Sequence, residues 1–134
     1  MELQVGVKVL LKNPEGRYLI MRRSPIKYPE TQKWDIPGGR IDTGSELIKN
    51  LIREVSEETG LEMTSTPKLV AAQDILKSGQ EKHVVRLTYT STAEGEPHLS
   101  EEHTEYKWVT LGDLRVLENL DRYVKTLLDE GTIS

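Results

Sequence analysis

The stretch from Gly39 to Leu61 constrains this chain most, because a glycine-rich turn there runs directly into a helical pattern. Its apolar residues recur at the spacing of a helix with one buried face. They are Leu47, Ile48, Leu51, Ile52 and Val55. Gly60 is typical of the residue that ends a helix, since glycine adopts the left-handed conformation without strain. The stretch therefore predicts a helix that packs one face against the rest of a folded domain.

Three carboxylates stand near the end of this helix. Glu54, Glu57 and Glu58 are spaced i, i+3 and i+4, which places them on one side of a helix. They border the apolar stripe, whereas Lys49 and Ser56 lie opposite it. Like charges at this spacing are mildly unfavourable, and carboxylates at the rim of a packed interface are costly without a partner. A divalent cation would compensate for them; the alternative is an ordinary solvated acidic helix end.

The same stretch resembles the Nudix box. That pattern runs Gly, five residues, Glu, seven residues, Arg-Glu, an aliphatic residue, any residue, Glu-Glu, any residue, Gly and an aliphatic residue. The positions in register are Gly39, Arg53, Glu54, Val55, Glu57, Glu58, Gly60 and Leu61. One position differs, because Ser45 stands where the box has its first glutamate, with Glu46 immediately after it.

The resemblance covers nearly the whole chain and implies an α/β fold, the Nudix α/β/α sandwich with a central mixed sheet, as a single domain over residues 1–134. It implies hydrolysis of a nucleoside diphosphate linked to another moiety, with Mg²⁺ or Mn²⁺ as cofactor. The implied catalytic residues are Arg53, Glu54 and Glu57, and the implied metal ligands are the Gly38 carbonyl, Glu54, Glu57 and Glu58. Such hard cations prefer these oxygen ligands. Glu54 is the expected base or water-orienting residue, and Arg53 is expected to orient it.

The serine at the first box position has two interpretations. By resemblance, the missing glutamate supports the box arginine, so the orientation of Arg53 is open and Glu46 is a candidate substitute. From the residues alone, Ser45 suits a helix N-cap, because its hydroxyl can accept from a free backbone N–H of the first turn. Glu46 next to it favours the positive helix end. We predict that Ser45 caps the helix.

Two further segments carry candidate site residues. The resemblance places Arg23 against the substrate phosphates, a role that suits arginine, and the alternative is a solvated strand end. Residues 101–109 resemble the second acidic site of many Nudix enzymes, with Glu102 as the first choice of metal ligand and Glu105 as the second. A solvated acidic loop is the alternative. Gly39 and Glu105 join Arg23 as the expected substrate-binding residues.

Alternation and turn signals predict the remaining elements. Strands are expected at residues 3–11, 17–23, 67–77, 83–92 and 105–110, a helical turn from Asp113, and a helix over residues 119–130. Trp34 is expected to anchor the core or a loop. None of the three histidines has metal-ligand spacing, and all are expected at the surface or in loops.

Composition limits the class of protein. The 134 residues contain no cysteine, so neither disulfides nor thiolate chemistry are available, and the net charge of −4 argues against a nucleic-acid polymer as partner. No signal peptide or membrane-spanning apolar run is visible, so we expect a cytoplasmic protein with no membrane partner. A small-molecule nucleotide is the expected partner, and the oligomeric state, monomer or homodimer, stays open.

Two other functions remain open from the sequence. The serine in the box suggests a catalytically weak domain that binds a nucleotide as a sensor, and an acidic helix that is only solvated would suit an interaction protein. Lys77 and Ser78 stand about sixteen residues after the box, where some family members carry a substrate marker, Pro or Tyr. Because neither Pro nor Tyr stands there, a nucleoside triphosphate or a modified nucleotide is favoured as substrate.

Overall fold

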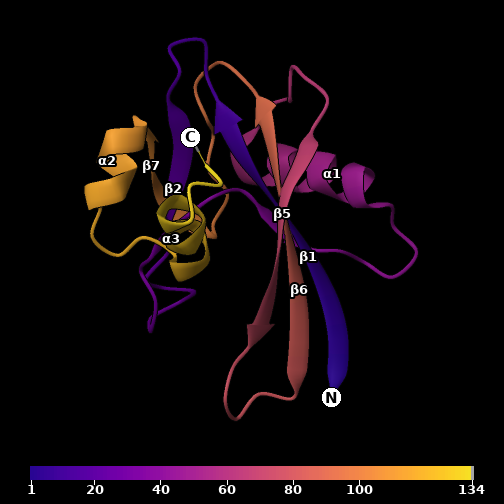
Figure 1. The fold of residues 1–134 in the computed structure, drawn as a ribbon. Coiled ribbons are helices and arrows are strands. Elements are labelled where there is room, and N and C mark those ends of the chain that lie inside the picture. The colour runs from indigo at the N-terminus through magenta and orange to yellow at the C-terminus, as the bar shows by residue number, and fades with distance from the viewer. Residues whose placement is uncertain (134) are drawn as a thin grey trace.

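The computed structural model describes residues 1–133 and contains a mixed sheet between two layers of helix (Figure 1). The strands are β1 (Glu2–Lys12), β2 (Tyr18–Arg23), β3 (Trp34–Asp35), β4 (Gly38–Arg40), β5 (Lys68–Leu76), β6 (Lys82–Thr92) and β7 (His103–Val109). The helices are α1 (Leu47–Thr59), α2 (Leu111–Val116) and α3 (Arg122–Asp129).

The sheet has the order β3-β2-β1-β6-β5, with β4 paired to β1 and β7 paired to β2. Strands β1 and β6 are parallel, and the other pairings are antiparallel. In Figure 1, α1 lies on one side of the strands and α2 and α3 lie on the other. The predicted α/β/α sandwich with a central mixed sheet is therefore confirmed.

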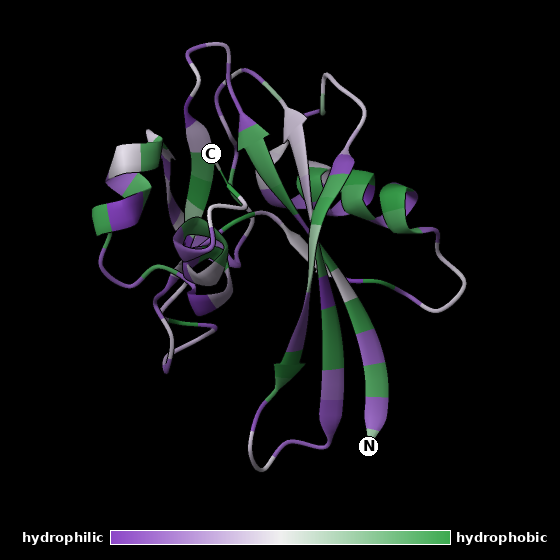
Figure 2. Ribbon diagram, in the orientation of Figure 1, coloured by the Kyte–Doolittle hydropathy of each residue, from purple (hydrophilic) through white to green (hydrophobic). Residues whose placement is uncertain are grey.

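Alternation along the two central strands divides the core between the two faces of the sheet. Val9 and Leu19 pack with Leu51 of α1, whereas Leu10 and Ile20 belong to the cluster that includes α2 and α3. Figure 2 shows hydrophilic and hydrophobic bands alternating along β1 near the N-terminus and a continuous hydrophobic stretch toward the other end of the strand. Successive side chains of a strand point to opposite faces, so strands that are buried on both faces need both sets to be apolar near the middle.

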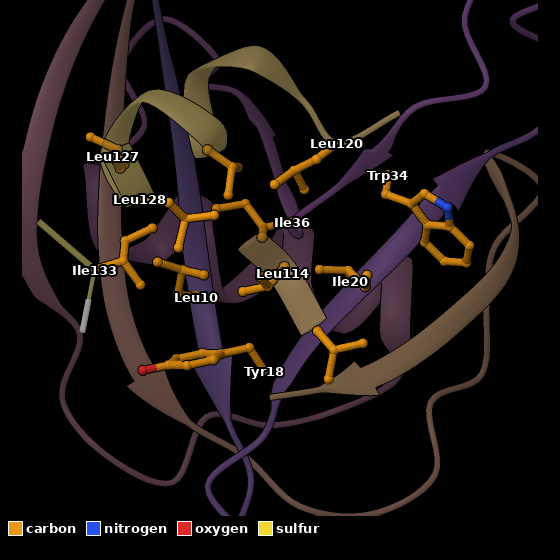
Figure 3. Packing of buried hydrophobic residues seen from close by; sticks show 12 residues of the cluster. Leu10, Tyr18, Ile20, Trp34, Ile36, Leu114, Leu120, Leu127, Leu128 and Ile133 are labelled. Carbon is orange, nitrogen blue, oxygen red and sulfur yellow. The ribbon is translucent and has the colours of Figure 1, made fainter. Parts of the chain in front are cut away.

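The cluster on the side of α2 and α3 is built from residues far apart in the sequence (Figure 3). Leu10 and Ile20 of the sheet meet Leu127 of α3, and all three are at most 2% exposed. Trp34 is 5% exposed in this cluster, as predicted for a core anchor. Two backbone hydrogen bonds fix the start of α3 beside β3. The N–H of Trp34 donates to the Asn119 carbonyl, and the N–H of Asp121 donates to the Trp34 carbonyl.

The predicted strands and helices are present with shifted ends, and two strands were missed. β3 and β4 are two and three residues long, too short to show alternation. The predicted apolar stripe of α1 was partly wrong, because Leu51 and Val55 are buried but Leu47 and Ile52 are 37% and 53% exposed. Gly60 ends α1 in the left-handed conformation, as predicted. No helix within residues 1–133 is long and apolar enough to cross a membrane.

Candidate functional site

The three box carboxylates lie at different depths along α1. Glu58 is 4% exposed, whereas the side chains of Glu54 and Glu57 are 18% and 58% exposed. Burial raises the pKa of Glu58 to about 7, even though Lys8 lies close enough to oppose it. Burial also raises the pKa of Glu54, and the neighbouring charges of Glu57 and Glu102 act in the same direction. The site therefore holds carboxylates that lack sufficient positive charge among the protein's own residues.

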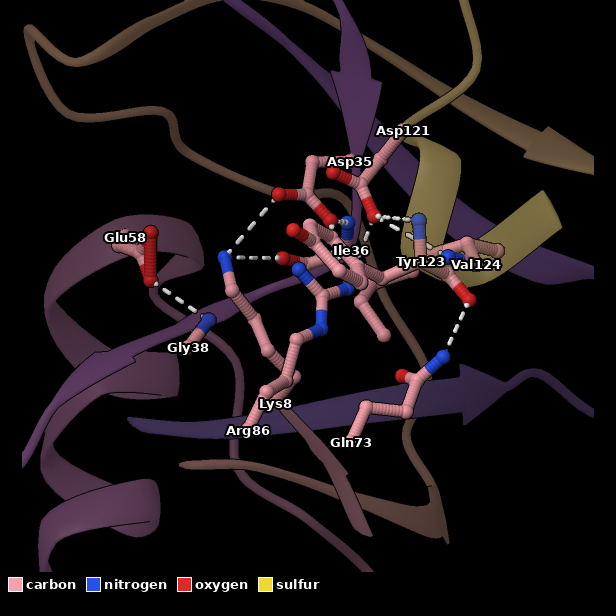
Figure 4. Close-up of polar contacts among 10 residues, drawn as sticks. All are labelled: Lys8, Asp35, Ile36, Gly38, Glu58, Gln73, Arg86, Asp121, Tyr123 and Val124. Carbon is pink, nitrogen blue, oxygen red and sulfur yellow. Dashed lines mark hydrogen bonds and ion pairs between the residues drawn. The ribbon is translucent and has the colours of Figure 1, made fainter. Parts of the chain in front are cut away.

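The glycine turn brings β4 against two of these carboxylates. The N–H of Gly38 donates to Oε2 of Glu58 over 2.9 Å (Figure 4). Gly38 has φ +142°, and a Cβ there would lie 2.0 Å from the carbonyl oxygen of Val7, so only glycine fits. A Cβ on Gly39 would lie 2.9 Å from Oε2 of Glu54. Gly38 is thus required for this approach, whereas a side chain at position 39 would displace the flexible carboxylate of Glu54. Metal binding by the Gly38 carbonyl stays a prediction.

The first residue of β7 and the turn before it supply further ligand atoms to the same place. Glu58, Glu102 and His103 each offer a ligand atom, and these atoms lie within 4.8 Å of one another. Glu105 does not join them, because it lies farther along β7 and pairs with Arg22 over 3.5 Å. Of the two acidic-loop candidates, the structure brings Glu102 to the box carboxylates and leaves Glu105 outside the cavity that they line.

The prediction that all three histidines lie at the surface or in loops was wrong for His103. This residue begins β7 and is 8% exposed, and burial lowers its pKa to about 4, with the charges of Lys8 and Arg23 adding to the effect. His98 is exposed, and His83 pairs with Asp74 over 2.7 Å. His103 was missed because the expected strand began two residues later, which left it in a loop.

Arg53 is held mainly by two residues that the sequence did not single out. Its Nη2 donates to Oδ2 of Asp42 over 3.0 Å and to Oδ1 of Asn50 over 2.9 Å. It also lies 3.4 Å from carboxylate oxygens of Glu54 and Glu57. Asn50 is fully buried. The guanidinium is therefore fixed beside Glu54 although Ser45 replaces the first box glutamate.

The predicted roles of Ser45 and Glu46 were not found. The N-cap of α1 is Glu46, and no side chain caps the helix. Glu46 pairs instead with Lys49 over 3.2 Å at the exposed surface. The helix begins one residue later than a Ser45 cap requires, because Ser45 N–H bonds the Asp42 carbonyl in the preceding turn. Glu46 therefore does not substitute for the missing glutamate.

Asp42→Ala is expected to lower any turnover by about 10-fold, because residues that orient a catalytic or metal-binding group typically matter by 10–100-fold. The Asp42 side chain is 76% exposed, so the free energy of unfolding should change by less than about 1 kcal/mol. Glu46→Ala is the matched control, since it removes an exposed carboxylate that pairs with Lys49 at the surface. Equal activity of the two variants in a steady-state assay would show that Asp42 does not orient Arg53.

A second network of charges lines the same cavity (Figure 4). Asp35 accepts from Lys8 over 3.3 Å and from Arg86 over 3.2 Å, and Arg86 also pairs with Asp121 over 3.2 Å. Burial alone would raise the pKa of Asp35, but the charges of Lys8 and Arg86 hold it well below its usual range. Asp121 also accepts from the N–H groups of Tyr123 and Val124 at the start of α3. This network ties β1, β3, β6 and α3 together.

The two networks share one cavity of about 560 Å³. Glu54, Glu58, Glu102 and His103 form its acidic end, and its other lining residues include Lys77, Gln80, Arg86 and Tyr123. Arg23 lines the cavity and stacks over Tyr28, with 4.7 Å between guanidinium carbon and ring centroid. Glu57 lines an adjoining groove with Glu54, Glu58 and Glu102. The arrangement therefore combines an acidic end, suited to a divalent cation, with basic side chains suited to phosphate.

Comparison with known proteins identifies the family. The family model of the NUDIX domain matches residues 2–129. The solved structure of a MutT protein from Methanosarcina mazei Go1 is 30% identical, with a TM-score of 0.84 over 96% of this chain and 92% of that chain.

Among curated proteins, a Bacillus subtilis protein described provisionally as an 8-oxo-dGTP diphosphatase is 30% identical over 81% of this chain and 68% of its own length. An m7GpppN-mRNA hydrolase of Xenopus laevis is 36% identical over 46% of this chain, which spans 21% of that relative. With the family model, the fold and the box in agreement, the chain belongs to the Nudix family of hydrolases.

Proposed function

We propose that this protein hydrolyses a nucleoside diphosphate linked to another group, by attack of water on phosphorus, with Mg²⁺ or Mn²⁺ as cofactor. The observation that carries the proposal is the convergence of Glu54, Glu58 and Glu102 on the cavity that Arg23 also lines. A divalent cation would screen the diphosphate charge and lower the pKa of a bound water. Carboxylate oxygens of Glu58 and Glu102 and a ring nitrogen of His103 lie close enough together for such an ion, and Nδ1 of His103 has no hydrogen-bond partner within residues 1–133.

Each residue has a proposed part in this reaction. Glu54, Glu57, Glu58 and Glu102 would hold the ion, with the Gly38 carbonyl as a further ligand. Glu54 would also take or orient the proton of the attacking water, a task for which burial prepares it by raising its pKa. Arg53, 3.4 Å from Oε1 of Glu54, would fix the carboxylate, and Arg23 would bind phosphate oxygens across the cavity.

A nucleoside triphosphate or a modified nucleotide is the proposed substrate class. The name of the Bacillus subtilis relative supports it, as does the size of the cavity, which can hold a nucleotide beside the acidic end. A panel of nucleoside triphosphates, oxidised nucleotides, dinucleoside polyphosphates and capped RNA, assayed with Mg²⁺ for phosphate and pyrophosphate release, tests the proposal. Tight binding of a nucleotide without turnover of any member would instead support a sensor.

Divalent cations are expected to stabilise the folded protein, because the site is rich in carboxylates that repel one another when empty. At a metal concentration one hundred times the dissociation constant, the gain is about 2.7 kcal/mol of unfolding free energy. Melting curves in chelator and in saturating Mg²⁺ or Mn²⁺ measure it. Glu46→Gln should respond like the wild type, since Glu46 lies outside the cavity. Identical curves with and without metal would favour an interaction protein whose acidic helix is only solvated.

A further inference from the structure

We propose that the imidazole of His103 is a ligand of this cation site, together with the carboxylates of Glu58 and Glu102, and that the site consequently prefers Mn²⁺, Co²⁺ or Zn²⁺ to Mg²⁺. The inference rests on the proposed function, because it refines the nature of the ion that the acidic end of the cavity binds. It differs from the ligand set implied by the resemblance to the Nudix box, in which every ligand atom is an oxygen.

The distances suit a shared ion. One ring nitrogen of His103 and one oxygen from each of Glu58 and Glu102 lie within 4.8 Å of one another. Ligand atoms that stand about 2.0–2.2 Å from the same ion are at most about 4.4 Å apart. The three groups are therefore already within a few tenths of an ångström of the separation that coordination allows. Small side-chain rotations of the exposed Glu102 would close the difference.

His103 has the character of a ligand rather than of a core residue. It is 8% exposed, yet it lines the cavity, and its Nδ1 has no hydrogen-bond partner among residues 1–133. A buried polar atom without a partner costs about 1–3 kcal/mol. The charged groups around it are Lys8, Arg23 and Asp35. Lys8 is already bonded to Asp35 and to the Ile36 carbonyl, so it does not satisfy the imidazole.

The backbone explains how two consecutive residues reach one site. In a regular strand, Glu102 and His103 would point to opposite faces of the sheet. Here Glu102 lies in the turn before β7, and His103 is the first residue of the strand. The pairing with β2 is irregular at this point, with a register shift between Arg22 and Arg23. The turn and the irregularity together let both side chains face Glu58.

The ligand set determines which ions should bind best. Sites made of carboxylate, carbonyl and water suit Mg²⁺, Ca²⁺ and Mn²⁺, whereas imidazole suits the later first-row transition metals. Mn²⁺, as a transition metal, also takes a nitrogen ligand more readily than Mg²⁺ does. An imidazole beside two carboxylates should therefore increase the preference for Mn²⁺, Co²⁺ or Zn²⁺ beyond that of an all-oxygen site. Mg²⁺ gains little from a nitrogen ligand, so removal of the imidazole should affect its binding least.

Pulsed electron paramagnetic resonance of the Mn²⁺ complex tests the ligand directly, because a coordinated imidazole nitrogen gives a ¹⁴N coupling. The chain has three histidines, so His83→Gln and His98→Gln are matched controls. We expect the coupling in the wild type and in both controls, and its loss in His103→Gln. Incorporation of ¹⁵N-histidine into the wild type should replace the ¹⁴N coupling by a ¹⁵N coupling. This needs no mutation, so the test stays valid if a variant folds poorly.

Binding measured by calorimetry gives the second readout. The ratio of the Mg²⁺ to the Mn²⁺ dissociation constant should fall by about 10-fold in His103→Gln and stay unchanged in His83→Gln and His98→Gln. Mn²⁺ binding without an imidazole coupling would overturn the proposed ligand and leave the proposed hydrolysis intact. Failure of the wild type to bind any divalent ion would overturn both, and turnover of a nucleotide without metal would overturn the proposed function itself.

Discussion

Glu54→Gln is expected to lower kcat by about 10²–10⁴-fold, or roughly 3–5 kcal/mol of barrier, because it removes the proposed base together with a metal ligand. Glutamine keeps nearly the shape of glutamate, so packing against Gly39 should change little. Glu58→Gln should instead weaken metal binding, and excess Mn²⁺ should restore part of its rate. Its side-chain oxygen can still accept the Gly38 N–H bond that the wild-type carboxylate makes.

Turnover measured against Mn²⁺ concentration separates the two variants, with thermal melting as the control for folding. Both variants should fold, since removal of one of several neighbouring carboxylates relieves repulsion. Near-normal turnover of Glu54→Gln on a good substrate would show that Glu54 is not the base. Glu102 would then be the next candidate, because it is the loop glutamate that lines the cavity.

The pH dependence of stability in the metal-free protein is expected to reveal two opposing groups. Burial raises the pKa of Glu58 from its ordinary value of 4.5 to about 7, so between these values the folded state holds a proton that the unfolded chain has lost. Glu58 thus destabilises the fold as pH rises. Burial lowers the pKa of His103 from 6.5 to about 4, so there the unfolded chain holds the extra proton. His103 thus stabilises the fold as pH rises.

Between pH 4.5 and 6.5, the two effects on the free energy of unfolding should largely cancel in the wild type. Removal of either group should make the effect of the other group visible. In Glu58→Gln the free energy of unfolding should rise with pH by about 2–3 kcal/mol relative to the wild type, and in His103→Gln it should fall by a similar amount. Urea titrations in chelator at pH 4.5, 5.5, 6.5 and 7.5 measure this. Parallel pH profiles for both variants and the wild type would contradict the burial of these groups.

Local patterns in the sequence were sufficient to predict the longer strands and the helix α1. Long strands such as β1 show alternation, and α1 shows both its periodicity and its terminal glycine, so these elements could be predicted from neighbouring residues. The helical wheel also placed the three carboxylates at the border of the apolar stripe, where the structure has Glu58 buried and Glu57 exposed. The exposed Leu47 and Ile52 were beyond this method, because the wheel does not say where the sheet stops covering the helix.

The parts that could not be predicted depend on residues distant in the sequence. Asp35 meets Lys8 and Arg86 only because β1, β3 and β6 come together, and no local pattern marks such a charge network. The contact of Arg53 with Asp42 arises across the glycine turn, where the sequence suggested Glu46 as the substitute. The roles proposed for the site residues stay predictions until variants are measured.

The parallel pairing of β1 with β6 has a consequence for how the chain folds. The ladder joins Glu2–Lys12 to Lys82–Thr92, so its partners stand more than half the chain apart. Closing so long a loop costs entropy before the new contacts repay it, which slows folding. During synthesis, the edge of β1 that pairs with β6 therefore stays unpaired until β6 has been made. The chain should be most prone to aggregation in this interval.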